Sequence, residues 1–453
     1  MKHSLASWGA LWFGVPLGAI LMAYAAATGL ALAVMFAFIV IVALAWPPAR
    51  LQVTLWGGAF AFASGGLSLP KLGYLLFLLC LGLTSVVRLG RDAPSERVRK
   101  SEVDALAYFT LLSCCIAIGI GKGLAHGAPL EWLLRDASTY VMLAASLPVG
   151  IGLARTTTKR QALPSLYAFA GLSAAAFCLN ILTARGESAI ELSRFAAGSM
   201  LVVGVGVAVA AARVAAGNSG WLLVAYSGVL IGLVLVSGTR TGLTLLAAFA
   251  AVAATRKLFG GRTGIVRQLF VVGGVLAIGT LVFAPLVTDG DFLASRVEAT
   301  RTVISEGLER DQSAIERATE YGIGLRMSEE HPLLGAGFGV VTSNIGPDGV
   351  PTSFYLDTPL LLPAKFGWLG SAVFVAAVAF GVRSIWRSRP PTDSGPDWRA
   401  LATIGTLVAW AAVIPFGAIS EDKGLGLGII LLYTACASRR REGDRRKAMS
   451  NVA

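Results

Sequence analysis

The sequence predicts an all-α, polytopic transmembrane helical bundle of about 12–14 helices, with one large helical loop on its outer side. Three observations predict this fold. The 453-residue chain is 55% hydrophobic and only 14% charged, which is more apolar surface than a soluble chain of this length can bury. Uncharged apolar runs long enough to cross a bilayer recur along most of the chain. A stretch of about seventy residues, 288–360, interrupts them, and long loops of this kind are usually functional.

The apolar runs define the individual helices. Each run of about 17–25 residues is a candidate span. The runs centre near residues 17, 38, 60, 80, 113, 146, 173, 204, 229, 248, 278, 375, 409 and 430. The chain therefore divides into transmembrane helices 1–11 (residues 1–287), the large loop (288–360), the last transmembrane helices (361–437) and a basic tail (438–453).

Lysine and arginine set the predicted orientation. With the N-terminus inside, five basic segments share the cytoplasmic side: 88–100, 155–160, 256–267, 383–399 and the tail. Both termini are then cytoplasmic, and the net charge of +12 reflects topology beside anionic lipid. The basic residues are dispersed and lack interleaved aromatic residues, which argues against nucleic acid as a partner.

The large loop predicts its own secondary structure. Ser313-Ala-Ile-Glu316 fits a capping box that starts a helix running to about Glu330, and Pro332 ends it. Arg317 and Tyr321 are four residues apart and so share a face of that helix. His331 stands where a side chain can cap the helix C-terminus. Gly335, Gly337 and Gly339 then allow a tight backbone path or the close approach of a ligand.

Arginines carry the clearest chemical signal. Arg240 lies between the apolar stretches 221–236 and 243–254, and a charge at that depth suggests a functional site. Guanidinium groups bind phosphate bidentately, so arginines at the outer surface suit a lipid-linked diphosphate. The alternative for the loop arginines is salt bridging to nearby glutamates. The external arginines are Arg185, Arg194, Arg240, Arg296, Arg301, Arg310, Arg317 and Arg326.

Several common motifs are missing from the sequence. We find no P-loop, no His-Glu-x-x-His, no Gly-x-Ser-x-Gly and no Cys/His metal spacing. All five cysteines lie in apolar runs, as small core residues do. The sequence therefore predicts neither a cofactor nor a metal site.

The order of these motifs resembles the superfamily of O-antigen ligases and of O-antigen and exopolysaccharide polymerases. An apolar helix ends in Ser237-Gly-Thr-Arg240, and two helices and a large loop follow. The loop holds an Arg-x-x-x-aromatic helix (Arg317 to Tyr321) and a His-Pro-Leu-x-Gly-x-Gly turn (331–337). A Tyr355-Leu-Asp357 segment and a Gly-x-x-Gly stretch (367–370) then enter the next helix. The resemblance covers roughly residues 220–385.

This resemblance implies a metal-independent, inverting glycosyltransferase of the GT-C type in the bacterial inner membrane, with the large loop in the periplasm and acting as an active-site lid. Its substrate is an oligosaccharide on undecaprenyl diphosphate, and a chain-length regulator is the implied protein partner. Arg240 and Arg317 would hold the diphosphate, with Tyr355 and Asp357 as further catalytic candidates. The substrate-binding candidates are Arg185, Arg194, Tyr321, Arg326, His331, Gly335 and Gly337.

Two other functions stay open beside polymerisation. Ligases of this superfamily place a histidine just before the Tyr-Leu pair, whereas this chain has Thr352-Ser-Phe-Tyr355 there, which favours a polymerase. A ligase that joins the glycan to lipid A-core or protein is the first alternative. A membrane transporter is the second, and it should show broken helices near the midplane and internal symmetry.

Overall fold

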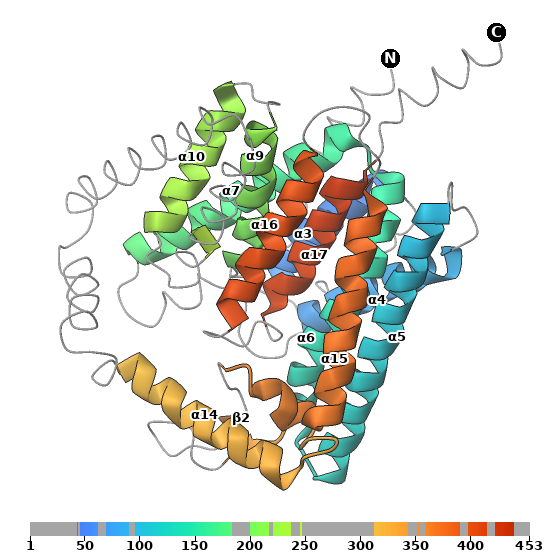
Figure 1. The fold of residues 1–453 in the computed structure, drawn as a ribbon, viewed down its shortest axis with the longest axis vertical. Coiled ribbons are helices and arrows are strands. Elements are labelled where there is room, and N and C mark those ends of the chain that lie inside the picture. The colour runs from blue at the N-terminus through green and yellow to red at the C-terminus, as the bar shows by residue number, and fades with distance from the viewer. Residues whose placement is uncertain are drawn as a thin grey trace.

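The structure is a computed structural model, and it is helical almost throughout the part it describes (Figure 1). It describes residues 43, 46–61, 69–89, 96–183, 200–216, 221–236, 245–246, 312–342, 352–353, 358–389, 397–414 and 422–438. The predicted all-helical class is confirmed for these residues. Their helices are α3 (Pro47–Ala61), α4 (Leu69–Arg88), α5 (Glu96–Ala125), α6 (Leu130–Thr156), α7 (Lys159–Thr183), α9 (Met200–Ala215), α10 (Trp221–Val236), α14 (Gln312–Glu330), α15 (Leu361–Ser388), α16 (Trp398–Val413) and α17 (Lys423–Ala437).

One short β-ladder departs from the predicted pattern. β1 (Val341–Thr342) pairs antiparallel with β2 (Thr352–Ser353), with Val341 opposite Ser353. Both strands belong to the predicted large loop, between α14 and α15. The ladder therefore brings Thr342 and Thr352, which flank residues 343–351, next to each other.

Four described helices are long and apolar enough to cross a membrane. They are the spans Lys71–Arg88, Val98–Ala125, Leu130–Thr156 and Leu361–Ser388. At a rise of 1.5 Å per residue, the longest reach about 40 Å, more than the hydrocarbon core of a bilayer. Each predicted span centre from 60 to 229 and from 375 to 430 lies in a helix. The centres near 17, 38, 248 and 278 fall outside the described helices.

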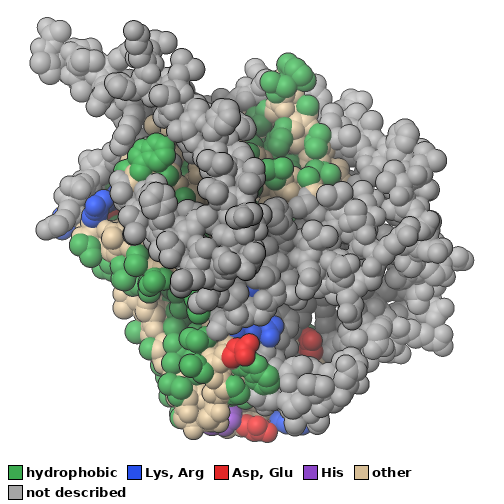
Figure 2. All heavy atoms as spheres, turned by 180° about the vertical axis from the view of Figure 1, so that it is seen from behind, with side chains coloured by type: hydrophobic (Ala, Val, Ile, Leu, Met, Phe, Trp, Pro, Cys, Tyr) green, Lys and Arg blue, Asp and Glu red, His purple; other side chains and the backbone are tan. Residues whose placement is uncertain are grey.

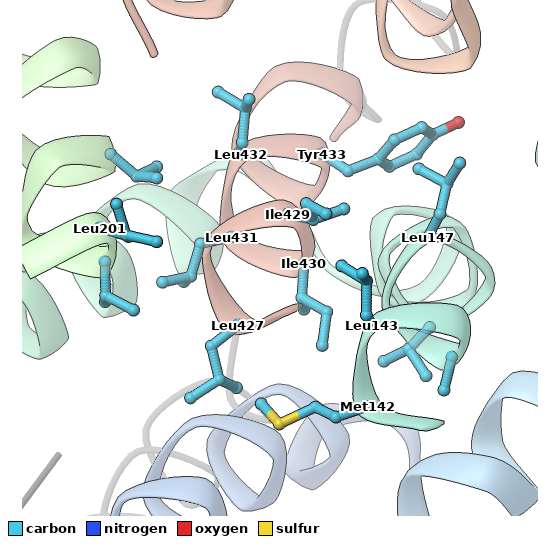
Figure 3. Packing of buried hydrophobic residues seen from close by; sticks show 14 of the residues in the cluster. Met142, Leu143, Leu147, Leu201, Leu427, Ile429, Ile430, Leu431, Leu432 and Tyr433 are labelled. Atoms are coloured by element: carbon cyan, nitrogen blue, oxygen red, sulfur yellow. The ribbon is translucent and has the colours of Figure 1, made fainter. Parts of the chain in front are cut away.

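Helix α6 lies at the centre of the bundle. It packs against α4, α5 and α17, while α5 also packs along α15. Close packing depends on small residues: a Cβ at Gly150 of α6 would lie 3.0 Å from Tyr433 Cβ of α17. Figure 3 shows side chains of α6 and α17 meeting in the buried core, beside Leu201 of α9.

Ion pairs gather at one end of the α5–α6–α15 group, which we call the charged end. Arg155 pairs with the buried Glu102 and donates to the Arg88 carbonyl at 3.1 Å. Arg387 pairs with Asp104 at 2.8 Å. Arg88, Arg155 and Arg387 belong to the segments 88–100, 155–160 and 383–399, which the sequence predicts on one side of the membrane, and Glu102 and Asp104 follow the first of them directly. In Figure 2 hydrophobic side chains cover much of the described surface between basic side chains near one end and a mixed group of acidic, basic and histidine side chains near the other.

Candidate functional site

The segment 331–339, which we call the glycine segment, turns sharply at the opposite end of the same helices. Gly335, Gly337 and Gly339 have φ values of 68°, 90° and 70°. L-residues rarely adopt this left-handed region, whereas glycine enters it without a Cβ clash. The alternating glycines therefore encode a backbone path that other residues would strain.

Close backbone contacts are a second reason for glycine in this segment. A Cβ at Gly335 would lie 2.3 Å from the carbonyl of Lys365 on α15. One at Gly337 would lie 2.5 Å from the amide nitrogen of Gly123 on α5. Of the two uses predicted for these glycines, the described contacts show the tight backbone path. Whether they also approach a substrate stays a prediction.

Helix α15 is broken where it meets the glycine segment. Gly367 has φ 66° and ψ 179°, so the helix is interrupted after one turn and a half. The break leaves carbonyls without helical partners. The Ala336 amide donates to the Ala364 carbonyl at 2.9 Å, and the Gly337 amide donates to the Lys365 carbonyl at 3.0 Å. The glycine segment thus caps the first piece of α15.

The second piece of α15 is capped by the same segment. The amide of Trp368, at the start of that piece, donates to the carbonyl of Pro332 at 2.8 Å. A Cβ at Gly367 would meet the Leu333 backbone at 2.3 Å, so only glycine fits at the break. Buried backbone groups that lose their helical partners must find other partners, because an unpaired buried group costs free energy. Here the glycine segment supplies them for both pieces.

A buried ion pair lies between the glycine segment and the bundle. Lys365 is 0% exposed, and its ammonium donates to Asp136 Oδ2 of α6 at 2.9 Å. The same oxygen accepts the Gly339 amide at 3.0 Å. Buried charges are costly unless they are paired and hydrogen-bonded, and this carboxylate meets both conditions.

Aromatic rings fill the space below the glycine segment. Phe338 is fully buried and stacks on Tyr140 of α6 with ring centroids 5.2 Å apart. Phe366, beside the break, meets Phe338 edge-on at 5.4 Å and Tyr140 edge-on at 5.1 Å. Such pairs add to the free energy gained from burial alone. They anchor the glycine segment between α6 and α15.

Two histidines from distant segments meet beside this turn. His126, in the short loop between α5 and α6, has its Nδ1 2.9 Å from the Ala336 carbonyl. Its ring centroid lies 5.2 Å from that of His331. Since a carbonyl can only accept, Nδ1 carries the proton in this contact and Nε2 is left as the acceptor in the neutral ring. Sequence analysis did not connect His126 with the site.

Helix α14 holds the predicted arginine motif and confirms the predicted helix ending at about Glu330. Its Met327 and Ile323 pack in a small cluster with Ala336, Leu361 and Ala364, separate from the main core. Tyr321 is 37% exposed. Arg326 is also exposed, and no carboxylate of the described chain pairs with it.

Two of the predicted arginines do not share a side of this helix. Arg317 and Arg326 are about two and a half turns and 13 Å apart along α14, so their positions lie on opposite sides. Arg317 and Tyr321 are about one turn apart and lie on the same side. One diphosphate is therefore not expected to contact both arginines.

The other predicted site residues divide into two sets. His331, Gly335 and Gly337 come together at the broken helix, and Arg317 is described in its backbone only. Among the described residues, no three His, Cys, Asp or Glu side chains form a group that could hold a metal ion. Arg185, Arg194, Arg240, Tyr355 and Asp357 lie outside the described residues.

No family model, curated protein or solved structure matches this chain.

Proposed function

We propose that this protein is a polysaccharide polymerase of the bacterial inner membrane. It transfers a growing glycan from undecaprenyl diphosphate to another lipid-linked repeat unit at the periplasmic face. The proposal rests on the motif order from Arg240 to Gly370, and one structural observation supports it above the others. The arginine helix α14 is joined to the bundle end opposite the charged end, through the glycine segment and the break in α15.

Two tryptophans on α15 support a position for the membrane in this proposal. Trp368 and Trp386 are 56% and 42% exposed, and they lie about five turns or 27 Å apart, on one side of the helix. Tryptophan collects at both surfaces of a bilayer whose hydrocarbon core is about 30 Å thick. The charged end faces the cytoplasm in this proposal. The glycine segment, next to Trp368, then lies at the outer surface together with α14.

The reaction is a displacement at the anomeric carbon of the donor sugar. The acceptor hydroxyl forms the new glycosidic bond, the bond to the diphosphate oxygen breaks, and the hydroxyl proton passes to a base. Charge builds on the leaving diphosphate, and fixed guanidinium groups stabilise it most in the transition state. Arg240 and Arg317 fill this role in the proposal, and Tyr355 and Asp357 remain the further catalytic candidates of the sequence.

The broken helix α15 also bears on the transporter alternative. Transporters use the free ends of broken helices to bind ions and substrates. In this chain the carbonyls of Ala364 and Lys365 and the amide of Trp368 already bond to the glycine segment. These groups are therefore occupied by the protein itself, which favours an enzyme over a transporter.

Reconstitution separates the possible functions. The purified protein in lipid nanodiscs receives the lipid-linked repeat unit alone, or with lipid A-core as a second acceptor, in the presence of EDTA. A polymerase makes a ladder of lipid-linked products from the repeat unit alone. A single transfer that requires lipid A-core would identify a ligase. Loss of activity in EDTA that Mg²⁺ restores would refute the metal-independent mechanism.

A further inference from the structure

Asp136 connects three parts of the molecule through one oxygen atom. Asp136 belongs to α6. Its Oδ2 accepts one hydrogen bond from the ammonium of Lys365 on α15, at 2.9 Å, and another from the amide of Gly339, at 3.0 Å. Lys365 is 0% exposed and Asp136 is 7% exposed. An ion pair this deeply buried, at the end of membrane helices, is costly to keep and suggests a function.

We infer that Asp136 and Lys365 are positioning residues, which set the place of α14 by holding the glycine segment against α6 and the broken helix. The inference rests on the proposed function only for its effect on catalysis. Its structural part, the docking of the glycine segment, stands by itself.

The described apolar contacts of α14 with the bundle are small. Among the side chains of α14 that the structure describes, residues 319–330, only Met327 and Ile323 enter a buried cluster, and that cluster is separate from the main core. The backbone leads directly from α14 into the glycine segment, since His331 donates its amide to the Met327 carbonyl at 3.1 Å. The orientation of α14 therefore depends on how firmly the glycine segment is held.

Lys365 holds the glycine segment by its backbone as well as its side chain. Its carbonyl accepts the Gly337 amide at 3.0 Å, while its ammonium fixes the carboxylate that accepts the Gly339 amide. An acceptor that carries a charge makes a stronger hydrogen bond than a neutral one. Removing the acceptor at position 136 should release Gly339, even when no unpaired charge is left behind.

Two double variants isolate this hydrogen bond. Asp136→Asn with Lys365→Met removes both charges but keeps an oxygen that can accept the Gly339 amide. Asp136→Leu with Lys365→Met removes the charges and the acceptor, with a side chain of similar shape. Glu102→Gln serves as the control, because it breaks a buried ion pair of α5 and α6 at the charged end.

The first measurement is hydrogen–deuterium exchange of peptides covering 312–339 in nanodiscs. Relative to wild type, we expect exchange at residues 337–339 to rise about 10-fold in the Asn variant and more in the Leu variant, because a charged hydrogen bond is replaced by a neutral one or by none. Glu102→Gln should leave it unchanged. If the Leu variant does not accumulate, the comparison of exchange rates between wild type and the Asn variant decides the test. Wild-type exchange in the variants that accumulate would overturn the inference.

Activity supplies the second measurement. A misplaced α14 should lower kcat more than it changes KM, in the same order as the exchange rates, and Glu102→Gln should spare both constants at a temperature where it is folded. Unchanged kcat in the Leu variant would overturn the positioning role even if docking loosens. A wild-type protein without polymerase activity would refute the proposed function, while the exchange data would still decide whether Asp136 holds the glycine segment.

Discussion

The main-chain amide of Trp368 donates to the carbonyl of Pro332 at 2.8 Å, and this bond joins the predicted large loop to the broken helix α15 just after its break. Trp368 begins the long piece of α15, and Pro332 follows the end of α14. The loop is therefore not a separate appendage in this region. It completes the hydrogen bonding of the bundle, which is why substitutions in the loop should affect the stability of the whole helical bundle.

Gly337→Ala should destabilise the protein strongly. Its φ of 90° disfavours any side chain, and the new Cβ would lie 2.5 Å from the Gly123 amide nitrogen. Strained backbone conformations of this kind cost about 1–3 kcal/mol, and the clash adds to that cost. Thermal unfolding in detergent should show a clearly lower midpoint.

Gly322→Ala is the matched control for that substitution. Gly322 lies inside α14, and a Cβ there would meet nothing within 4 Å. Alanine is favoured over glycine in a helix interior by about 1 kcal/mol, so the variant should be as stable as wild type or more so. Equal unfolding midpoints for the two alanine variants would show that the glycine segment is not packed as described.

Cysteine labelling tests the proposed orientation. Glu329 and Lys100 are both exposed, one near the glycine segment and the other near the charged end. In intact spheroplasts, a membrane-impermeant maleimide should label Glu329→Cys, whereas Lys100→Cys should react only after permeabilisation. The unsubstituted protein provides the background, since its cysteines lie in apolar runs. The reverse pattern would invert the topology and remove the proposed periplasmic site.

His126→Ala should have a modest effect on stability. The substitution removes the hydrogen bond to the Ala336 carbonyl and the ring contact with His331. A hydrogen bond contributes about 0.5–1.5 kcal/mol net, and this one is partly exposed. His126→Asn keeps a donor and should recover part of the loss in an unfolding measurement. A large loss in both variants would assign His126 a role beyond this bond.

Sequence patterns predicted the local features of the site and not its long-range contacts. The capping box near Ser313 and the helix-ending Pro332 predicted α14, because both signals act within a few residues. Asp136, His126 and Lys365 were not predicted, since each meets the glycine segment from a distant part of the chain. The one available signal in the sequence was a charged residue beside an apolar run, and it applied to Asp136 and Lys365 but not to His126. The break at Gly367 was not predicted, because the sequence places the Gly367–Gly370 stretch in the next helix without a signal for an interruption.

The central claim is that Arg240 and Arg317 stabilise the leaving diphosphate, and single-turnover transfer from the lipid-linked donor tests it most directly. Losing one such group typically lowers the rate about 100–1,000-fold. We expect that loss for Arg240→Ala and Arg317→Ala, and a similar one for Arg240→Lys, which keeps the charge but loses the planar fork. Arg296→Ala and Arg310→Ala should stay within a few fold of wild type, because we expect these loop arginines to form salt bridges with nearby acids and not to bind the diphosphate. Normal transfer by Arg240→Ala, together with loss in Arg296→Ala, would contradict this account.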